Sequence, residues 1–408
     1  MSAINSQRSG GALSGLRILD LSRILAGPTC TQLLGDMGAD VIKIERPGEG
    51  DDTRTWGPPY VVDVQGNPTR ESAYYLSANR NKRSVALDIA KPQDAEKVRE
   101  LLLSCDVVVE NFKVGGLKKY GLDYESLSKL KPDLVYCSIT GFGQTGPNAH
   151  RPGYDLLAQA FGGIMSITGE PEGEPMKVGV GVADVICGLY ATVAILAAIR
   201  HRDQTGEGQH IDLALVDSQV SWLVNAGTNY LASGKLPRRL GNQHPNIVPY
   251  QVFETADGHV VVAVGNDSQY RAFCKAISRN DLASDPRYST NGSRIEHREE
   301  LVADIAMTLR QIDKSTLVAA MEAAGVPGGP INNLEEVFSS DQVAAREMKI
   351  SIPHPAAGSG QVNLIGNPIK FSRTPVSYRR HPPRCGEHTQ EVLQEFGLQP
   401  GELAKIED

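Results

Sequence analysis

The acidic residue best placed for covalent chemistry is Asp184, which follows two glycines and precedes a long apolar run. Gly179 and Gly181 lie just before it, and residues 185–199 carry no charge. Glycines let a bulky ligand approach the backbone, which suits a carboxylate that attacks a substrate. The same pattern also fits a helix cap, where Asp184 would accept backbone N–H groups and stay ionised in the helix dipole. Other parts of the sequence must decide between a nucleophile and a cap.

Strands and helices alternate on both sides of this acid, and together they must position it. Short apolar runs predict strands at 16–21, 41–45, 84–89, 106–110, 134–139 and 209–216. Helical spacing predicts helices at 28–37, 92–105 and 124–130, and a buried helix over the run that ends in Arg200, His201 and Arg202. This alternation predicts an α/β fold with a parallel, Rossmann-like sheet. Dinucleotide binding is disfavoured, because the first turn holds one glycine, Gly27, where the fingerprint needs three.

The pattern changes near residue 225, where a smaller α+β domain is predicted to extend to residue 335. Two β-rich runs at 250–254 and 259–265 flank Ala256-Asp257-Gly258, which is typical of a hairpin. Helices are expected at 268–278, 297–309 and 315–324. Short strand-like pieces follow at 355–380, and a closing helix at 389–396.

The composition of the 408 residues excludes several classes of protein. A net charge of −7 argues against a general nucleic-acid binder. No apolar run is uninterrupted enough to predict a membrane span, and the first residues lack the apolar core of a signal peptide. Six cysteines without CxxC spacing indicate reduced thiols in a cytoplasmic protein. His210 and His244 have no partner at metal-ligand spacing, so we expect no metal.

Cations in three segments suggest a phosphate site at one edge of the sheet. They lie at 79–83 (NRNKR), at Arg46 and Arg54, and at Lys113, Lys118 and Lys119. Ligands of open α/β sheets bind beyond the carboxyl ends of the strands, where most of these segments are expected. The alternative is a solvated basic face.

Eight segments together resemble the class III CoA-transferases, the family of formyl-CoA and carnitine-CoA transferases. They are LSGLRILDLSRILAGP at 13–28, GADVIKIERPGEGDDTR at 38–54, NRNKRSVALD at 79–88, DVVVENFKVGGL at 106–117, RPGYDLLAQA at 151–160, VADVICGLYA at 182–191, GVPGGPINN at 325–333 and GEHT at 386–389. The resemblance implies a large Rossmann-like domain from both chain ends, over 1–224 with a returning segment at 336–408, and a small domain at 225–335. It also implies a homodimer of interlocked rings.

The resemblance also implies a mechanism and a set of site residues. Asp184 takes the position of the catalytic aspartate, which forms an anhydride and then an aspartyl-CoA thioester, so that no ATP is needed. Gly181 and Gly241 would open and close to exclude water. Coenzyme A, as co-substrate, is expected to contact Arg23, Ile24, Leu25, Arg46, Asn111, Phe112, Lys119 and Thr140. The acyl group is expected near Trp56, Arg54, Tyr154 and Gly241.

Two alternatives remain at this stage. An α-methylacyl-CoA racemase belongs to the same superfamily, but its second acid/base would fall on Tyr154, which is a poor base near neutral pH. A non-catalytic CoA-binding protein would keep the basic loops but has no use for an acid at Asp184.

Three further segments, at 50–59, 137–147 and 246–253, resemble the family members that move CoA from succinyl-CoA to glutarate. We therefore expect a short dicarboxylate acceptor, and itaconate or mesaconate would suit the same pocket. The second carboxylate of a diacid needs a cation or several donors where it is buried. Arg54, Arg80 and His244 are the candidates, although both arginines could instead bind CoA and His244 could face solvent.

Overall fold

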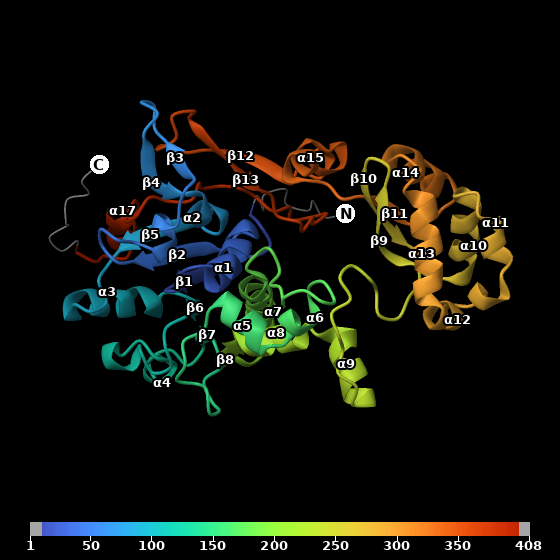
Figure 1. Cartoon of the computed structure of the whole chain (residues 1–408). Coiled ribbons are helices and arrows are strands. Elements are labelled where there is room, and N and C mark those ends of the chain that lie inside the picture. Colours follow the sequence, from blue (N-terminus) through green and yellow to red (C-terminus); the bar gives the residue numbers. More distant parts are fainter. Residues whose placement is uncertain (1–9, 400–408) are drawn as a thin grey trace, which may run out of the picture. The chain divides into compact units, whose positions relative to one another are not determined.

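A computed structural model describes residues 10–399 of the chain, which divide into two compact units (Figure 1). Within the described range, the first unit comprises residues up to 164, 177–233 and those from 341 onwards. The second comprises 165–176 and 234–340. Each unit has its own apolar core.

The first unit is built on a six-stranded sheet in which every neighbouring pair is parallel. The strands, in the order β5-β2-β1-β6-β7-β8, are β5 (Lys82–Ala86), β2 (Asp40–Glu45), β1 (Arg17–Asp20), β6 (Val107–Glu110), β7 (Val135–Thr140) and β8 (Gln209–Ala214). The mixed α/β fold with a parallel sheet is therefore confirmed. The order of the strands reverses between β1 and β6, and such a switch point opens a crevice at the carboxyl ends of the strands.

Alternate residues of the strands face two separate cores, as the period of a strand requires. Ile18, Val107 and Val109 pack against helices α1 (Ala26–Asp36) and α7 (Val182–Thr205). Leu19 and Val108 point the other way, toward α3 (Pro92–Leu103), α4 (Tyr124–Leu127) and α17 (Thr389–Glu395). The carboxy-terminal helix α17 thus covers the same sheet as the amino-terminal strands.

Helix α7 confirms the predicted helix, but the expectation that the whole run is buried is wrong. Ala183, Cys187 and Ala191 face the core, because their small side chains allow close packing on α1 and β7. Leu189 and Val193 on the other side are 48% and 65% exposed. By length and composition alone, α7 is the one helix in the described range that could cross a membrane, although its inner side belongs to the core of the sheet.

The remaining elements of the first unit cover its edges, and most of them were not predicted from the sequence. They are η1 (Asp52–Thr55), β3 (Tyr60–Val62), β4 (Pro68–Ser72), α2 (Ala73–Ser77), η2 (Lys118–Tyr120), α5 (Asp155–Phe161), α6 (Ile164–Ile167, at the boundary), α8 (Leu215–Ser221), α9 (Val224–Ser233), α16 (Asp341–Ala345), β12 (Lys349–Pro353) and β13 (Gln361–Ile365). Strands β12 and β13 form an antiparallel pair. Strand β13 lies within 355–380, where strand-like pieces were expected, whereas β12 precedes that region.

The second unit combines a three-stranded antiparallel sheet with a group of helices. The predicted hairpin is present as β9 (Tyr250–Thr255) and β10 (Gly258–Ala263), and β11 (Gly328–Pro330) pairs with β10. The helices are α10 (Asp267–Ala276), α11 (Asn280–Ser284), η3 (Pro286–Tyr288), α12 (Asn291–Glu296), α13 (Arg298–Leu309), α14 (Lys314–Ala323) and α15 (Leu334–Ser339).

Candidate active site

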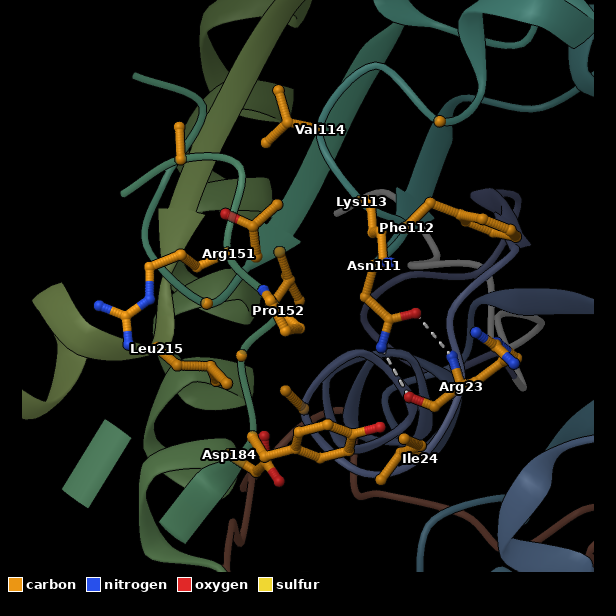
Figure 2. Close-up of a pocket in the computed structure, with 18 of the residues that line it drawn as sticks. Arg23, Ile24, Asn111, Phe112, Lys113, Val114, Arg151, Pro152, Asp184 and Leu215 are labelled. Atoms are coloured by element: carbon orange, nitrogen blue, oxygen red, sulfur yellow. Dashed lines mark hydrogen bonds between the residues drawn. The ribbon is translucent and has the colours of Figure 1, made fainter. Parts of the chain in front are cut away.

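A cavity of about 440 Å³ opens at the switch point of the sheet, where the loops after β1, β6 and β7 meet the start of α7 (Figure 2). The structure brings nine of the expected site residues to it: Arg23, Ile24, Leu25, Asn111, Phe112, Lys119, Thr140, Tyr154 and Asp184. These residues are far apart in the sequence, and they meet because parallel strands end at one edge of the sheet.

Asp184 lies in the first turn of α7, but it does not cap the helix. The N-cap position is Gly181, and the capping carboxylate is that of Asp155, the first residue of α5. Its Oδ1 accepts hydrogen bonds from the backbone N–H of Ala183 at 2.8 Å and of Asp184 at 3.4 Å. The side chain of Asp184 is therefore not needed to cap α7, and it lines the cavity.

The expectation that the helix end keeps Asp184 ionised is also wrong. Burial raises the pKa of its carboxyl to about 7, and the negative charge of Asp155 acts in the same direction. The helix dipole favours the carboxylate, but loss of water and a like charge outweigh that effect here. The carboxyl of Asp184 therefore keeps its proton to a much higher pH than an ordinary aspartate does.

Trp56, which was expected near the acyl group, belongs to an aromatic pair and lines neither cavity. The ring of Tyr74, on α2, meets that of Trp56 edge to face, with 5.2 Å between the centroids. Burial raises the pKa of Tyr74, and the charges of Asp184 and Asp155 raise it further. Trp56 itself is 42% exposed. Sequence reasoning named Trp56 but missed Tyr74.

Asn111, which was expected to contact CoA, binds the neighbouring loop with both ends of its amide. Its Oδ1 accepts from the N–H of Arg23 at 2.9 Å, and its Nδ2 donates to the carbonyl of Arg23 at 2.7 Å (Figure 2). The turn that carries Asn111 is fixed by Glu110, whose Oε2 accepts from the N–H of Phe112 at 2.7 Å. Burial raises the pKa of Glu110 to about 7.

A second cavity, of about 510 Å³, adjoins the first and shares Arg23 and Phe112 with it. Arg46 lines this second cavity and not the one that holds Asp184. Its guanidinium is largely exposed and pairs with Glu49 at 2.9 Å. Arg70, which sequence reasoning did not name, lies in the same cavity.

Arg54 does not face either cavity, so the expectation that it binds the acyl group is not met. Its guanidinium is buried and makes five hydrogen bonds, to Glu45, Glu71 and the carbonyl of Pro383. A guanidinium has five N–H donors, so none is left for a ligand. The ring of Tyr75 lies 3.6 Å from the guanidinium carbon.

The cations of 79–83 do not form a phosphate site either. Strand β5 begins at Lys82, two residues earlier than expected, so this segment lies at the amino end of the sheet and away from the cavities. Its side chains are buried in ion pairs: Arg80 with Asp36, Lys82 with Asp20, and Arg83 with Asp40 and Glu395. Arg80 is therefore also excluded as the partner of a second carboxylate.

Other cations do reach the first cavity. Lys113 and Lys119 follow β6 as expected, and Arg151 joins them from the segment before α5. Among the described residues, none of these three forms an ion pair with a carboxylate, whereas Arg23 pairs with Asp52 at 2.8 Å. Arg151 was missed as a site residue because its segment shows no strand or helix pattern, although it belongs to the RPGYD motif.

Gly241 and His244 belong to the second unit. Gly241 has a φ of +56°, which favours glycine, and its N–H donates to the carbonyl of Gly169. The Nδ1 of His244 accepts from the N–H of Asn246 at 3.0 Å. Burial and the charge of Arg298 lower the pKa of His244. Within residues 10–399, no group of three or more histidine, cysteine or acidic side chains is arranged to hold a metal.

A doubly wound α/β sheet with an acid and several cations at its switch point is suited to binding an anionic ligand. Residues 13–389 match the model of CoA-transferase family III, and the chain belongs to this family. It is therefore a CoA-transferase.

Known relatives support this assignment over nearly the whole chain. A succinate–glutarate CoA-transferase of Agrobacterium fabrum is 50% identical over 384 residues, which cover 94% of this chain and 95% of the relative. A human succinyl-CoA:glutarate CoA-transferase is 44% identical (94% and 85% covered), and a succinyl-CoA:mesaconate CoA-transferase of Haloarcula marismortui is 45% identical (96% and 98%). A crystal structure of a CAIB/BAIF family protein from Brucella suis matches with a TM-score of 0.84 and 47% identity, covering 95% of this chain and all of that one.

Proposed function

We propose that the protein moves CoA from succinyl-CoA to glutarate or a similar C4–C6 diacid, with Asp184 as the covalent carrier. The observation that carries the proposal is the place of Asp184, which lines the switch-point cavity while Asp155 caps its helix. The names of the relatives support the substrates, because all three act on dicarboxylates.

The two adjoining cavities suit an extended CoA ester. Arg46 and Arg70 in the second cavity supply charge for phosphates, and Phe112 and Arg23 border both cavities. The thioester end would then lie beside Asp184. Lys113, Lys119 and Arg151 supply positive charge for the carboxylates of the donor and acceptor acids.

The reaction follows from a carboxylate nucleophile and needs neither ATP nor a metal. The Asp184 carboxylate attacks the thioester carbonyl of the donor, and CoA leaves as its thiolate, which gives an anhydride. The thiolate attacks the Asp184 carbonyl of the anhydride, releases the donor acid and leaves an aspartyl-CoA thioester. The acceptor carboxylate attacks this thioester, releasing the thiolate and forming a second anhydride. The thiolate then attacks the acceptor's carbonyl, which yields the new CoA ester and frees Asp184.

The ionisation of Asp184 sets a condition on the first step. Only the carboxylate is nucleophilic, and a pKa of about 7 leaves part of Asp184 protonated at neutral pH. The burial that raises this pKa also limits the access of water to the anhydride. Gly181 at the start of α7 gives the backbone beside the nucleophile room to adjust.

We further propose a cytoplasmic homodimer in which the first unit binds CoA and the second unit is the small domain. Large apolar side chains support the dimer, since Val193 on α7, Trp222 after α8 and Leu231 on α9 are 65%, 44% and 82% exposed in one chain. Sedimentation at decreasing concentration should show no dissociation, and a stable folded monomer would contradict the dimer.

An acceptor panel tests the proposed substrates. With succinyl-CoA as donor, kcat/KM is compared for glutarate, itaconate, mesaconate, oxalate, formate, carnitine and butyrate. We expect short diacids to lead, because the cavity offers several cations to a second carboxylate. Butyrate is the matched control, since it lacks only the second charged end of a short diacid. If butyrate or carnitine exceeds every diacid, the substrate class is wrong.

A further inference from the structure

The loop after β1 has a backbone conformation that its sequence disfavours. Ile24 has a φ of +73°, in the left-handed region, although it is β-branched. A residue of this type is rarely found there because the conformation is strained, so it persists only where the surroundings hold it. Ile24 lines the cavity that holds Asp184, with Arg23 on one side and Leu25 on the other.

A buried ion pair holds this strained residue. Both carboxylate oxygens of Asp51 lie 3.2 Å from the N–H of Ile24. Asp51 pairs with Lys43 at 2.9 Å, and neither side chain has any exposed surface. Lys43 also donates to the carbonyl of Ser22 at 2.7 Å, so one ammonium group links the carboxylate to the loop it holds.

The pair is well supported by its surroundings. Burial lowers the pKa of Lys43, but the carboxylates of Asp51, Asp20 and Glu45 outweigh it and leave the pKa above its usual value. Asp51 further accepts from the N–H and the hydroxyl of Thr53, at 3.0 and 2.8 Å. Such a pair resists disruption, because removing one partner leaves the other charge buried and unpaired.

The position of the pair connects it to the binding of CoA esters. Lys43 and Asp51 lie at the wall of the second cavity with their side chains buried, Ile24 lines the first cavity, and Arg23 lines both. If Ile24 relaxed to an ordinary negative φ, the chain would rotate by roughly 140° at this point. That rotation would change the direction of Arg23 relative to Leu25, and with it the wall between the cavities.

We propose that Lys43 and Asp51 are positioning residues for CoA binding, which hold Ile24 in the left-handed conformation and so shape the wall between the two cavities. The inference rests on the proposed assignment of these cavities to CoA esters. The ion pair would thus do more than stabilise the fold. It would keep Ile24 in a strained conformation that shapes the CoA site.

Binding of free CoA, measured by calorimetry, tests the proposal with Asp51→Asn and two second-site changes at Ile24. Asp51→Asn keeps the size and one acceptor oxygen but removes the charge. We expect CoA affinity to fall at least about tenfold, since hydrogen bonds to charged groups are the strong ones. Adding Ile24→Gly should restore affinity to within about threefold of the unmodified protein, because glycine adopts a positive φ without strain.

The matched control is Ile24→Val in the same Asp51→Asn background. Valine is shorter than isoleucine, as glycine is, but it remains β-branched and should not restore binding. With succinyl-CoA as donor, KM should rise in Asp51→Asn while kcat changes by less than about threefold, because Asp184 is unchanged. A loss of folded protein would instead lower the apparent kcat. A folded Asp51→Asn that binds CoA normally, or equal rescue by valine and glycine, overturns the proposal.

Two further measurements keep the outcome decisive. In the unmodified protein, the N–H of Ile24 should exchange slowly with solvent although Ile24 borders a cavity. Fast exchange would contradict a stable hydrogen bond from this N–H to Asp51, and this test does not depend on the folding of Asp51→Asn. Phe112→Ala tests the cavity assignment itself, since Phe112 borders both cavities. If Phe112→Ala leaves CoA affinity unchanged, the proposed function fails at this site. If it weakens binding and Asp51→Asn does not, only the positioning role fails.

Discussion

Replacing Asp184 by asparagine should abolish transfer and at the same time stabilise the protein at alkaline pH. Burial and the charge of Asp155 raise the pKa of Asp184 from an ordinary 3.8 to about 7. This difference corresponds to at most about 4 kcal/mol, which the folded protein loses when the carboxyl ionises. Because Asp184 is partly exposed, solvent reduces the effect, and we expect about 2 kcal/mol.

The sign of the effect follows from the raised pKa. The folded state prefers the neutral acid, so the contribution of this one carboxyl to stability is greatest below pH 3.8 and falls as the pH rises toward 7. Asparagine does not titrate and avoids this loss. The advantage of Asp184→Asn should therefore be full at pH 8 and less than half as large at pH 5.

Thermal and urea unfolding at pH 5 and pH 8 measure this advantage. Glu322→Gln, on an exposed position of α14, is the control for loss of one negative charge. Asp184→Asn should gain stability at pH 8 relative to this control and show no transfer. If Asp184→Asn is no more stable than the unmodified protein at pH 8, or if the difference is the same at both pH values, the electrostatic account of Asp184 is wrong.

Three other substitutions test separate parts of the site. Asp155→Asn keeps a hydrogen-bond acceptor for the start of α7 but removes the charge that helps to raise the pKa of Asp184. The midpoint of kcat/KM against pH should therefore shift from near 7 to lower pH. An unmoved midpoint would show that burial alone sets the pKa of Asp184. Arg54→Ala should destabilise the protein by roughly 3–5 kcal/mol in urea unfolding, since it leaves Glu45 and Glu71 unpaired. A change in acceptor preference without loss of stability would instead show that Arg54 binds the acyl group. Arg46→Ala should raise KM for succinyl-CoA by about three- to tenfold with little effect on kcat, because a phosphate contact is made equally in the ground and transition states. An unchanged KM would show that Arg46 does not bind CoA.

The sheet could be predicted from the sequence because its strands are apolar runs bounded by clear breaks. Val107–Glu110 and Val135–Thr140 lie where the pattern places them, and both are almost wholly buried. The hairpin around Asp257-Gly258 is equally local, since the turn residues specify it. Helix α5 and the residues before it gave no such signal, and there the sequence missed Asp155.

The charged residues were harder to interpret, because a sequence does not show which charges are buried together. Arg54 and Arg80 resemble ligand-binding cations in their motifs, but buried acids from distant segments occupy both. Asp184 illustrates the opposite error, because its pKa is raised first by burial and then by the charge of Asp155, which is 29 residues away in the chain. The switch point itself follows from strand order, which emerges only when the strands are paired.

The most direct test of the account is to trap the covalent intermediate on Asp184. The protein is incubated with succinyl-CoA, treated with hydroxylamine and digested, and the peptide that spans Gly181–Ile186 is examined by mass spectrometry, with Asp184→Asn as the control. We expect a hydroxamate at Asp184 that requires the CoA ester and is absent from the variant. An enzyme that transfers CoA but carries no modification at Asp184, or carries it on another acid, would show that Asp184 is not the covalent carrier.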